Sequence, residues 1–120
     1  MDRRSQGSIA EVAARDLLIA HGLKVIAQNY RCRFGELDLV LIDRGVLVVV
    51  EVRARSSLKF GGASASVDRH KRQRIRLAAR HLLLARRELR HLPVRFDVVV
   101  FNSCAAASGP EWIKGAFEAD

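Results

Sequence analysis

The spacing of hydrophobic residues changes several times along the chain, and each change predicts a different element. Ile9 to His21 is dense in aliphatic residues and is followed by Gly22, a common residue just beyond a helix, so we expect a first helix there. Segments with alternating or continuous β-branched and aliphatic residues predict five strands. These are Lys24 to Tyr30, Leu37 to Ile42, Val46 to Val52, Val94 to Phe101 and a short Glu111 to Lys114, with a tail from Gly115.

A long helix is predicted from Val67 to about Glu88. Its apolar residues follow the i, i+3, i+4, i+7 spacing of one buried helix face: Ile75, Ala78, Ala79 and Leu82. The Gly- and Ser-rich stretch 56–66 before it has no periodicity and predicts a loop. The expected fold is therefore α/β, a mixed central sheet of about five strands flanked by two main helices, in one domain over residues 1–120.

Composition excludes several classes of protein. With 49% hydrophobic residues in periodic blocks, the chain of 120 residues can bury a core and is not disordered. The longest apolar run, 46–50, is far shorter than the roughly 20 residues of a membrane-spanning helix. The N-terminus shows no signal-peptide core, and Cys32 and Cys104 have no metal-ligand spacing. We therefore expect a cytoplasmic protein without a membrane partner.

The positive charge is concentrated in one part of the chain. The formal net charge is +8, but 69–95 alone holds ten basic residues against one acidic residue and nets +9. Within it, four arginines form a stripe on the helix face opposite the apolar one: Arg69, Arg72, Arg76 and Arg80. Such a strip favours a polyanion partner, most often nucleic acid. The alternatives are a solvated helix face and a surface that binds an acidic protein.

A pair of acidic residues is the strongest chemical signal. If Arg44 and Gly45 form a two-residue hairpin turn, Asp38 faces Glu51 and Glu36 faces Arg53 on the neighbouring strand. Directly opposed carboxylates, with Cβ atoms about 4.5–5.5 Å apart, destabilise a sheet unless a cation lies between them. Hard oxygen ligands at this separation suit Mg²⁺ or Mn²⁺.

Other interpretations of these acids stay open. The pair could decorate a solvated sheet face, or the register could slip by one residue and separate the two carboxylates. Against the first alternative, Glu51 lies within an otherwise apolar run, where an exposed acid is unexpected. Cross-strand pairing with Glu36 would explain Arg53 without any catalytic role.

Several motifs together resemble a known family. They are GELDL at 35–39, VVEVRAR at 49–55, FG at 60–61, Lys71 and RFDVV at 95–99. They resemble the YraN-like family of small bacterial proteins, which is similar to the PD-(D/E)XK nucleases, close to Holliday-junction resolvases. The resemblance covers nearly the whole chain and implies a restriction-endonuclease-like fold.

The resemblance also implies roles for individual residues. Asp38 and Glu51 correspond to the two metal-binding acids, and the main-chain carbonyl of Val52 to a third ligand. Glu11 resembles an additional acid near the metal, although a solvated helix acid is the alternative. Arg53 stands where the motif has lysine; an arginine can neutralise a phosphorane but cannot act as a base. Lys71 could reach the site from the second helix, or it belongs to the basic strip.

These observations lead to one expected function and two alternatives. The first is a Mg²⁺- or Mn²⁺-dependent, structure-selective DNA endonuclease, possibly acting on branched DNA and possibly as a homodimer. Asp38, Glu51, Arg53 and Glu11 would be its catalytic residues, and Lys71 with the helix arginines would bind phosphates. The second is a catalytically impaired, nucleic-acid-binding accessory module in DNA processing. The third is a domain that binds an acidic protein partner.

Overall fold

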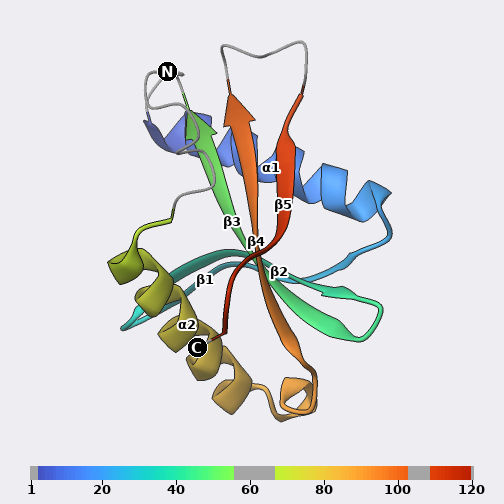
Figure 1. Cartoon of the computed structure of the whole chain (residues 1–120), viewed down its shortest axis with the longest axis vertical. Helices are drawn as coiled ribbons and strands as arrows, with labels where there is room; N and C mark the ends of the chain where they lie inside the picture. Colours follow the sequence, from blue (N-terminus) through green and yellow to red (C-terminus); the bar gives the residue numbers. More distant parts are fainter. Residues whose placement is uncertain (1–2, 56–66, 103–108, 120) are drawn as a thin grey trace.

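The computed structural model describes residues 3–55, 67–102 and 109–119, and Figure 1 shows how their helices and strands are arranged. The predicted loop at 56–66 and Cys104 lie outside these residues. The elements are α1 (Arg3–Ala20), β1 (Lys24–Cys32), β2 (Gly35–Asp43), β3 (Val46–Arg55), α2 (Arg69–Ala85), the short 3₁₀ helix η2 (Arg87–Leu89), β4 (Val94–Asn102) and β5 (Glu111–Phe117).

The five strands form one mixed sheet in the order β1-β2-β3-β4-β5. All neighbours are antiparallel except β3 and β4, which run parallel and are connected through α2. A parallel pair needs such a crossover, because a hairpin cannot join strands that run in the same direction. The expected α/β class with a five-stranded mixed sheet is confirmed, and the architecture agrees with a restriction-endonuclease-like fold.

The predicted register between β2 and β3 is confirmed along their paired length. Arg44 and Gly45 both have positive φ, +48° and +84°, as a two-residue type I′ turn requires. This turn sets Asp43 opposite Val46, and the pairing continues to Leu39 opposite Val50. The hairpin therefore brings the acidic ends of the two strands toward each other.

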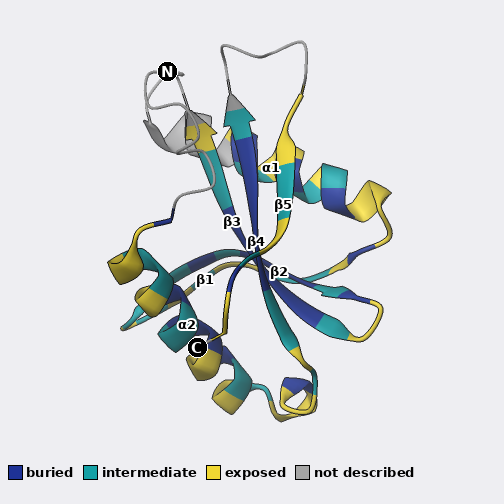
Figure 2. Cartoon of the chain, viewed as in Figure 1, coloured by how far each residue is buried: buried dark blue, intermediate teal, exposed yellow. Residues whose placement is uncertain are grey.

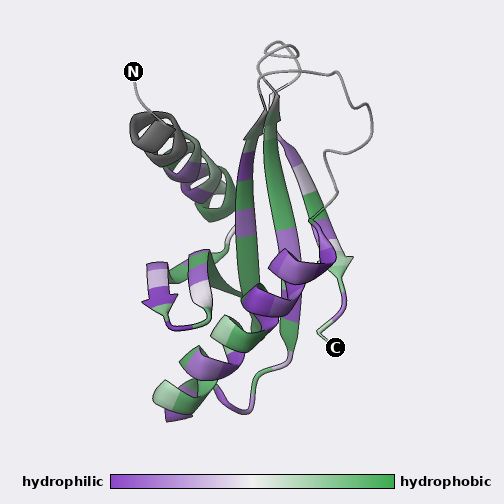
Figure 3. Ribbon diagram, turned by 90° about the vertical axis from the view of Figure 1, so that its left-hand side faces the viewer, coloured by the Kyte–Doolittle hydropathy of each residue, from purple (hydrophilic) through white to green (hydrophobic). Residues whose placement is uncertain are grey.

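Hydrophobic residues pack on both faces of the sheet, and Figure 2 shows the buried residues along the middle of β3 and β4. On one face, Ala14 and Leu18 of α1 pack with Val48, Val50 and Val99. On the other face, the predicted stripe of α2 packs against the alternate strand residues, which include Leu47, Val49 and Val98. Figure 3 shows α1 to one side of the strands and hydrophilic bands along α2. The sheet is thus the middle layer between two helices.

Element boundaries differ from the predicted ones at three places. Helix α1 begins at Arg3, before the predicted start at Ile9. Helix α2 ends at Ala85, and a separate 3₁₀ turn follows. The expected tail from Gly115 is wrong, because β5 continues to Phe117. The Phe117 ring stacks on Phe96 with centroids 4.9 Å apart, and this packing keeps the end of the chain on the sheet.

A buried polar network explains one arginine of the basic segment. Asp97 on β4 is fully buried and accepts hydrogen bonds from Arg95 Nε (2.9 Å) and Nη2 (3.0 Å), Trp112 Nε1 (2.9 Å) and the Gly115 amide (2.9 Å). Arg95 Nη2 also donates to Asp43 at 3.1 Å. These bonds tie β5 to β4 and assign Arg95 to the fold. No helix within the described chain has the length and apolarity needed to cross a membrane.

Candidate metal and phosphate site

The sheet opens between β2 and β3 at the position of the two predicted acids. Their ladder ends at Leu39 opposite Val50; beyond it β2 stays paired with β1, while β3 stays paired with β4. The predicted pairs of Asp38 with Glu51 and of Glu36 with Arg53 therefore lie past the last ladder rung. Asp38 bridges the opening, since its Oδ2 accepts a hydrogen bond from the Val52 amide at 2.9 Å. The Val52 carbonyl faces the same strand edge as its amide.

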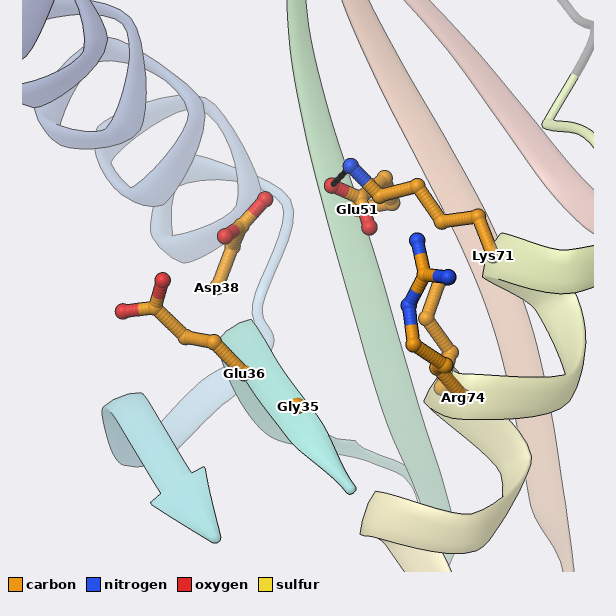
Figure 4. A pocket seen from close by; sticks show the side chains of 7 residues that line it. Gly35, Glu36, Asp38, Glu51, Lys71 and Arg74 are labelled. Atoms are coloured by element: carbon orange, nitrogen blue, oxygen red, sulfur yellow. Dashed lines mark ion pairs between the residues drawn. The ribbon is translucent and has the colours of Figure 1, made fainter. Parts of the chain in front are cut away.

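A cavity of about 190 Å³ occupies this opening. Figure 4 shows its acidic side chains on the sheet and two basic side chains reaching from α2 toward Glu51. The described residues that line it are Gly35, Glu36, Asp38, Glu51, Lys71, Arg74 and Ile75. A carboxylate wall thus faces a cationic wall, and the space between them can hold several waters or a small anion.

Glu51 is the most constrained acid of the cavity. Its side chain is 7% exposed, and the Lys71 ammonium lies 3.3 Å from its Oε1. Burial and the negative charge of Asp38 raise the pKa of Glu51 to about 8, although Lys71 acts in the opposite direction. Lys71 therefore offsets only part of the effect that burial and the neighbouring Asp38 have on Glu51. Asp38 and Glu51, which the sequence analysis places opposite each other, both line this cavity.

Asn29 links Glu11 to the cavity, a connection that the sequence analysis missed. In the amide orientation that supplies donors to both acids, the Asn29 side chain donates to Glu11 Oε1 at 2.9 Å and to Glu36 Oε2 at 3.2 Å. Burial and the charge of nearby Asp38 raise the pKa of Glu11 above its usual value. Helix α1 thus places its acid beside the strand acids. Asn29 has φ +51°, a backbone conformation that asparagine adopts more readily than most residues.

Glu36 and Arg53 occupy different surroundings. Glu36 lines the cavity and accepts a hydrogen bond from Arg31 Nε at 3.2 Å. Arg53 is half-buried on β3, opposite Val100 of β4, and lies outside the set of described residues that line the cavity. The cationic group with a defined contact to one of the two principal acids is Lys71 on α2, which lies beside Glu51.

The donor set fits a hard divalent cation. The available groups are carboxylate oxygens, the ligands that Mg²⁺ and Mn²⁺ prefer. Within residues 3–55, 67–102 and 109–119, no group of three His, Cys, Asp or Glu side chains has metal-binding geometry. The side chains alone therefore do not form a closed cage. Mg²⁺ tolerates such a site, because it is usually bound through one or two carboxylates and keeps several waters.

The predicted arginine stripe lies on the same helix as the cationic wall. Asp68 caps the start of α2 by accepting from the Lys71 amide at 2.8 Å, so Lys71 is fixed in the first turn. Arg69 is exposed and Arg72 half-buried. Arg76 donates to the Glu118 carbonyl at 2.8 Å and lies over the Phe117 ring. Arg80 is exposed and makes contacts of its own. Arg76 thus faces the end of β5, whereas Lys71 and Arg74 face β2 and β3 across the cavity, so the stripe and the cavity lie on different flanks of α2.

Comparison with known proteins gives consistent results. The family model described as Uncharacterised protein family UPF0102 matches residues 10–101. A UPF0102 protein of Methylobacillus flagellatus is 49% identical over 115 residues, which cover 94% of this chain and 96% of that protein. One of Methylococcus capsulatus is 47% identical over 113 residues, with 94% and 90% covered. One of Legionella pneumophila is 39% identical over 116 residues, with 97% of each chain covered.

Proposed function

This chain belongs to the UPF0102 family, the YraN-like family, and we propose that it is a metal-dependent DNA endonuclease. The enzyme would use Mg²⁺ or Mn²⁺ to hydrolyse phosphodiester bonds, with branched DNA as the favoured substrate. The observation that carries the proposal is the cavity in which Asp38 and Glu51 face Lys71 and Arg74. A phosphodiester hydrolase needs an oxygen-ligand site for a cation beside positive groups that bind the phosphate. Helix α2 would bind the DNA backbone through basic side chains on both of its flanks, with Lys71 and Arg74 at the cavity and the arginine stripe on the side toward β5.

Each side chain has a role that follows from its position. Asp38, Glu51 and the Val52 carbonyl would hold the metal ion, and Glu11 would assist through water. When bound, the metal supplies an activated water and charge neutralisation at the phosphate. Lys71 and Arg74 would bind the non-bridging phosphate oxygens from the opposite wall. The Val52 amide keeps the Asp38 carboxylate oriented through its 2.9 Å hydrogen bond.

Arg53 stands where the nuclease motif has lysine, but the site still contains a lysine, Lys71, from α2. Arg53 can stabilise negative charge on the phosphorane but does not exchange its proton at neutral pH. Lys71 brings an ammonium to 3.3 Å from Glu51 from a different element. We therefore assign to Lys71 the electrostatic role of the motif lysine, and to Arg53 a supporting role.

The ion pair between Lys71 and Glu51 also favours a second function, that of an accessory module that binds nucleic acid. If Lys71 stays on Glu51 permanently, it neutralises the acid that a metal ion needs, and the protein is a nucleic-acid-binding accessory module without cleavage activity. In both cases DNA binds through the basic side chains of α2. Binding of a divalent ion is the property that separates the two functions.

Cleavage of purified substrates tests the proposal. Four-way, nicked and linear duplex DNA should be incubated with the protein in Mg²⁺, in Mn²⁺ and in EDTA, with Asp38→Asn as the matched variant. We expect metal-dependent cleavage, strongest on branched DNA, that Asp38→Asn abolishes. Calorimetry with Mn²⁺ should be run beside it. Metal binding without cleavage of any substrate would contradict the nuclease, and DNA binding without metal binding would favour the accessory module.

A further inference from the structure

The ion pair between Lys71 and Glu51 joins a surface side chain to a buried one. The Lys71 side chain is 41% exposed, whereas Glu51 is 7% exposed, and their charged atoms lie 3.3 Å apart. Lysine carries its ammonium on a flexible four-carbon stem, so it can change partner without movement of the backbone. Helix α2 itself is held in place by its N-cap at Asp68 and by its buried stripe.

We propose that Lys71 is an exchangeable counter-ion: a divalent cation replaces it at Glu51, and the released ammonium then binds a phosphate of the nucleic acid together with Arg74. This inference rests on the proposed function, since it assumes that Asp38 and Glu51 bind the metal. It adds an order of events, because the phosphate-binding group becomes available only when the metal is present.

The geometry supports the first half of the exchange. Glu51 offers its carboxylate inside a confined cavity, and a divalent ion coordinated there carries the same sign of charge as the ammonium that is already beside it. Two cations at such short range repel each other strongly in a partly buried site. The divalent cation carries the higher charge and is also bound by Asp38, so Glu51 attracts it more strongly than it attracts the Lys71 ammonium. The flexible lysine side chain therefore moves away.

The second half follows from what lies near Lys71. Arg74, one turn further along α2, lines the same cavity, so the two side chains form a cationic wall on its rim. Lysine and arginine are both phosphate ligands, and arginine provides planar, two-pronged recognition. A phosphate between this wall and the carboxylate-bound metal is attracted from both sides. The cavity volume of about 190 Å³ is several times that of one water, about 30 Å³, and accommodates such a group.

The exchange predicts reciprocal coupling between metal and DNA. Metal binding frees the phosphate ligand, and phosphate binding removes the competitor of the metal, so each should tighten the other by the same factor. We expect this factor to be about fivefold or more, the lower end of coupled binding sites.

Chemical reactivity of the lysines tests the exchange directly in the wild-type protein. The chain has four lysines, and an amine-acylating reagent followed by mass spectrometry measures each one separately. We expect the reactivity of Lys71 to rise about fivefold with saturating Mg²⁺, the same factor as the expected coupling, because its ammonium is released from Glu51. The reactivity should fall again when a duplex oligonucleotide is added, because a phosphate then binds the ammonium. Exposed Lys24 and Lys114 are internal controls for the Mg²⁺ step.

Two variants provide an independent measurement. Lys71→Met should reduce the coupling between Mg²⁺ and duplex binding, measured by fluorescence anisotropy in Mg²⁺ and in EDTA. Arg87→Met changes the net charge equally on an exposed residue outside the cavity lining and should retain the coupling. If calorimetry shows Mg²⁺ binding while Lys71 reactivity and the coupling stay unchanged, the exchange is wrong and the metal site stands. If Mg²⁺ does not bind, both the exchange and the proposed nuclease are overturned.

Discussion

The backbone amide of Val52 donates a hydrogen bond to Oδ2 of Asp38 at 2.9 Å, just beyond the last paired residues of β2 and β3. This bond fixes the carboxylate of Asp38, which also lines the cavity. It also replaces the ladder bond that would otherwise hold the two strands together. The same hydrogen bond thus lies at the opening of the sheet and orients its principal acid.

Removing one of the two facing charges should stabilise the metal-free protein. We expect Asp38→Asn to melt at a higher temperature than wild type in EDTA, because asparagine keeps an oxygen acceptor for the Val52 amide but no longer repels Glu51. Mn²⁺ should stabilise the wild type by about 2.7 kcal/mol at a hundredfold excess over its dissociation constant, and the variant far less. Thermal melts of both proteins, with and without Mn²⁺, measure this. A lower melting temperature for the variant in EDTA, or equal responses to Mn²⁺, would show that the acids do not share a metal site.

Stability without metal should depend on pH through Glu51. Its pKa is raised from an ordinary 4.5 to about 8, mainly by burial and by Asp38. A group with a raised folded-state pKa favours the fold below its unfolded pKa, and this stabilisation is lost as pH rises from about 4.5 to about 8. Urea unfolding in EDTA at several pH values across this window should show the decline, and Glu51→Gln should flatten it. Equal slopes for the two proteins would contradict the raised pKa.

Arg53→Lys tests whether the arginine limits catalysis. We expect the variant to keep the fold and to raise, or to create, Mn²⁺-dependent cleavage of nicked or branched DNA, because it restores the lysine of the nuclease motif. Initial rates on the same branched substrate compare the two proteins. A wild type that cuts well and a lysine variant that cuts less would instead identify Arg53 as an adapted catalytic residue.

DNA binding through α2 should be weak and strongly dependent on salt. Replacing Arg72 and Arg76 together should reduce the slope of log affinity against log salt by up to about 2, if each neutralises one phosphate. Arg44→Ala in the hairpin turn is the control, since it removes an exposed charge from another element. Binding should vary little with base sequence, because phosphate contacts carry no sequence information. An unchanged slope in the double variant would identify the stripe as a solvated helix face.

Asp97 should be among the residues most important for stability. Its replacement by alanine leaves Arg95, the Trp112 indole and the Gly115 amide without their buried acceptor, at a cost of about 3–5 kcal/mol. Urea unfolding measures this, with Glu111→Ala on the exposed side of β5 as a control expected within about 0.5 kcal/mol of wild type. If Asp97→Ala and Glu111→Ala lower the free energy of unfolding by similar amounts, the hydrogen bonds of Asp97 have no special role in stability.

The fold could be predicted where local patterns determine it. The two-residue turn at Arg44 and Gly45 sets the β2–β3 register, and the i, i+3, i+4, i+7 spacing identifies the buried face of α2. The end of β5 could not be predicted in this way, because Gly115 suggests a tail. What holds that segment is the acceptor Asp97 and the ring of Phe96, which lie on another strand.

In the candidate site, too, some features follow from local sequence patterns and others depend on tertiary packing. The hairpin register predicts that Asp38 and Glu51 lie near each other, and both line the cavity, although the paired part of the two strands ends one residue before them. The contact of Asn29 with Glu11 and Glu36 depends on a left-handed backbone residue and on the position of α1, and no local pattern encodes either. The same holds for Lys71, whose distance from Glu51 depends on how the crossover helix packs. Tertiary packing therefore determined the residues that the sequence analysis missed or left open.

The parallel pairing of β3 with β4 has a consequence for the order of folding. Strands β1, β2 and β3 are joined by short turns, whereas β4 reaches β3 only after the whole crossover has closed, and such non-local pairing forms slowly. The acids on β2 and β3 should therefore come together before Lys71 and Arg74 arrive on α2. Pulsed hydrogen exchange during refolding would detect early protection in the first hairpins and late protection in β4. During this interval the carboxylates face solvent without Lys71, the protein group that pairs with Glu51 in the folded chain.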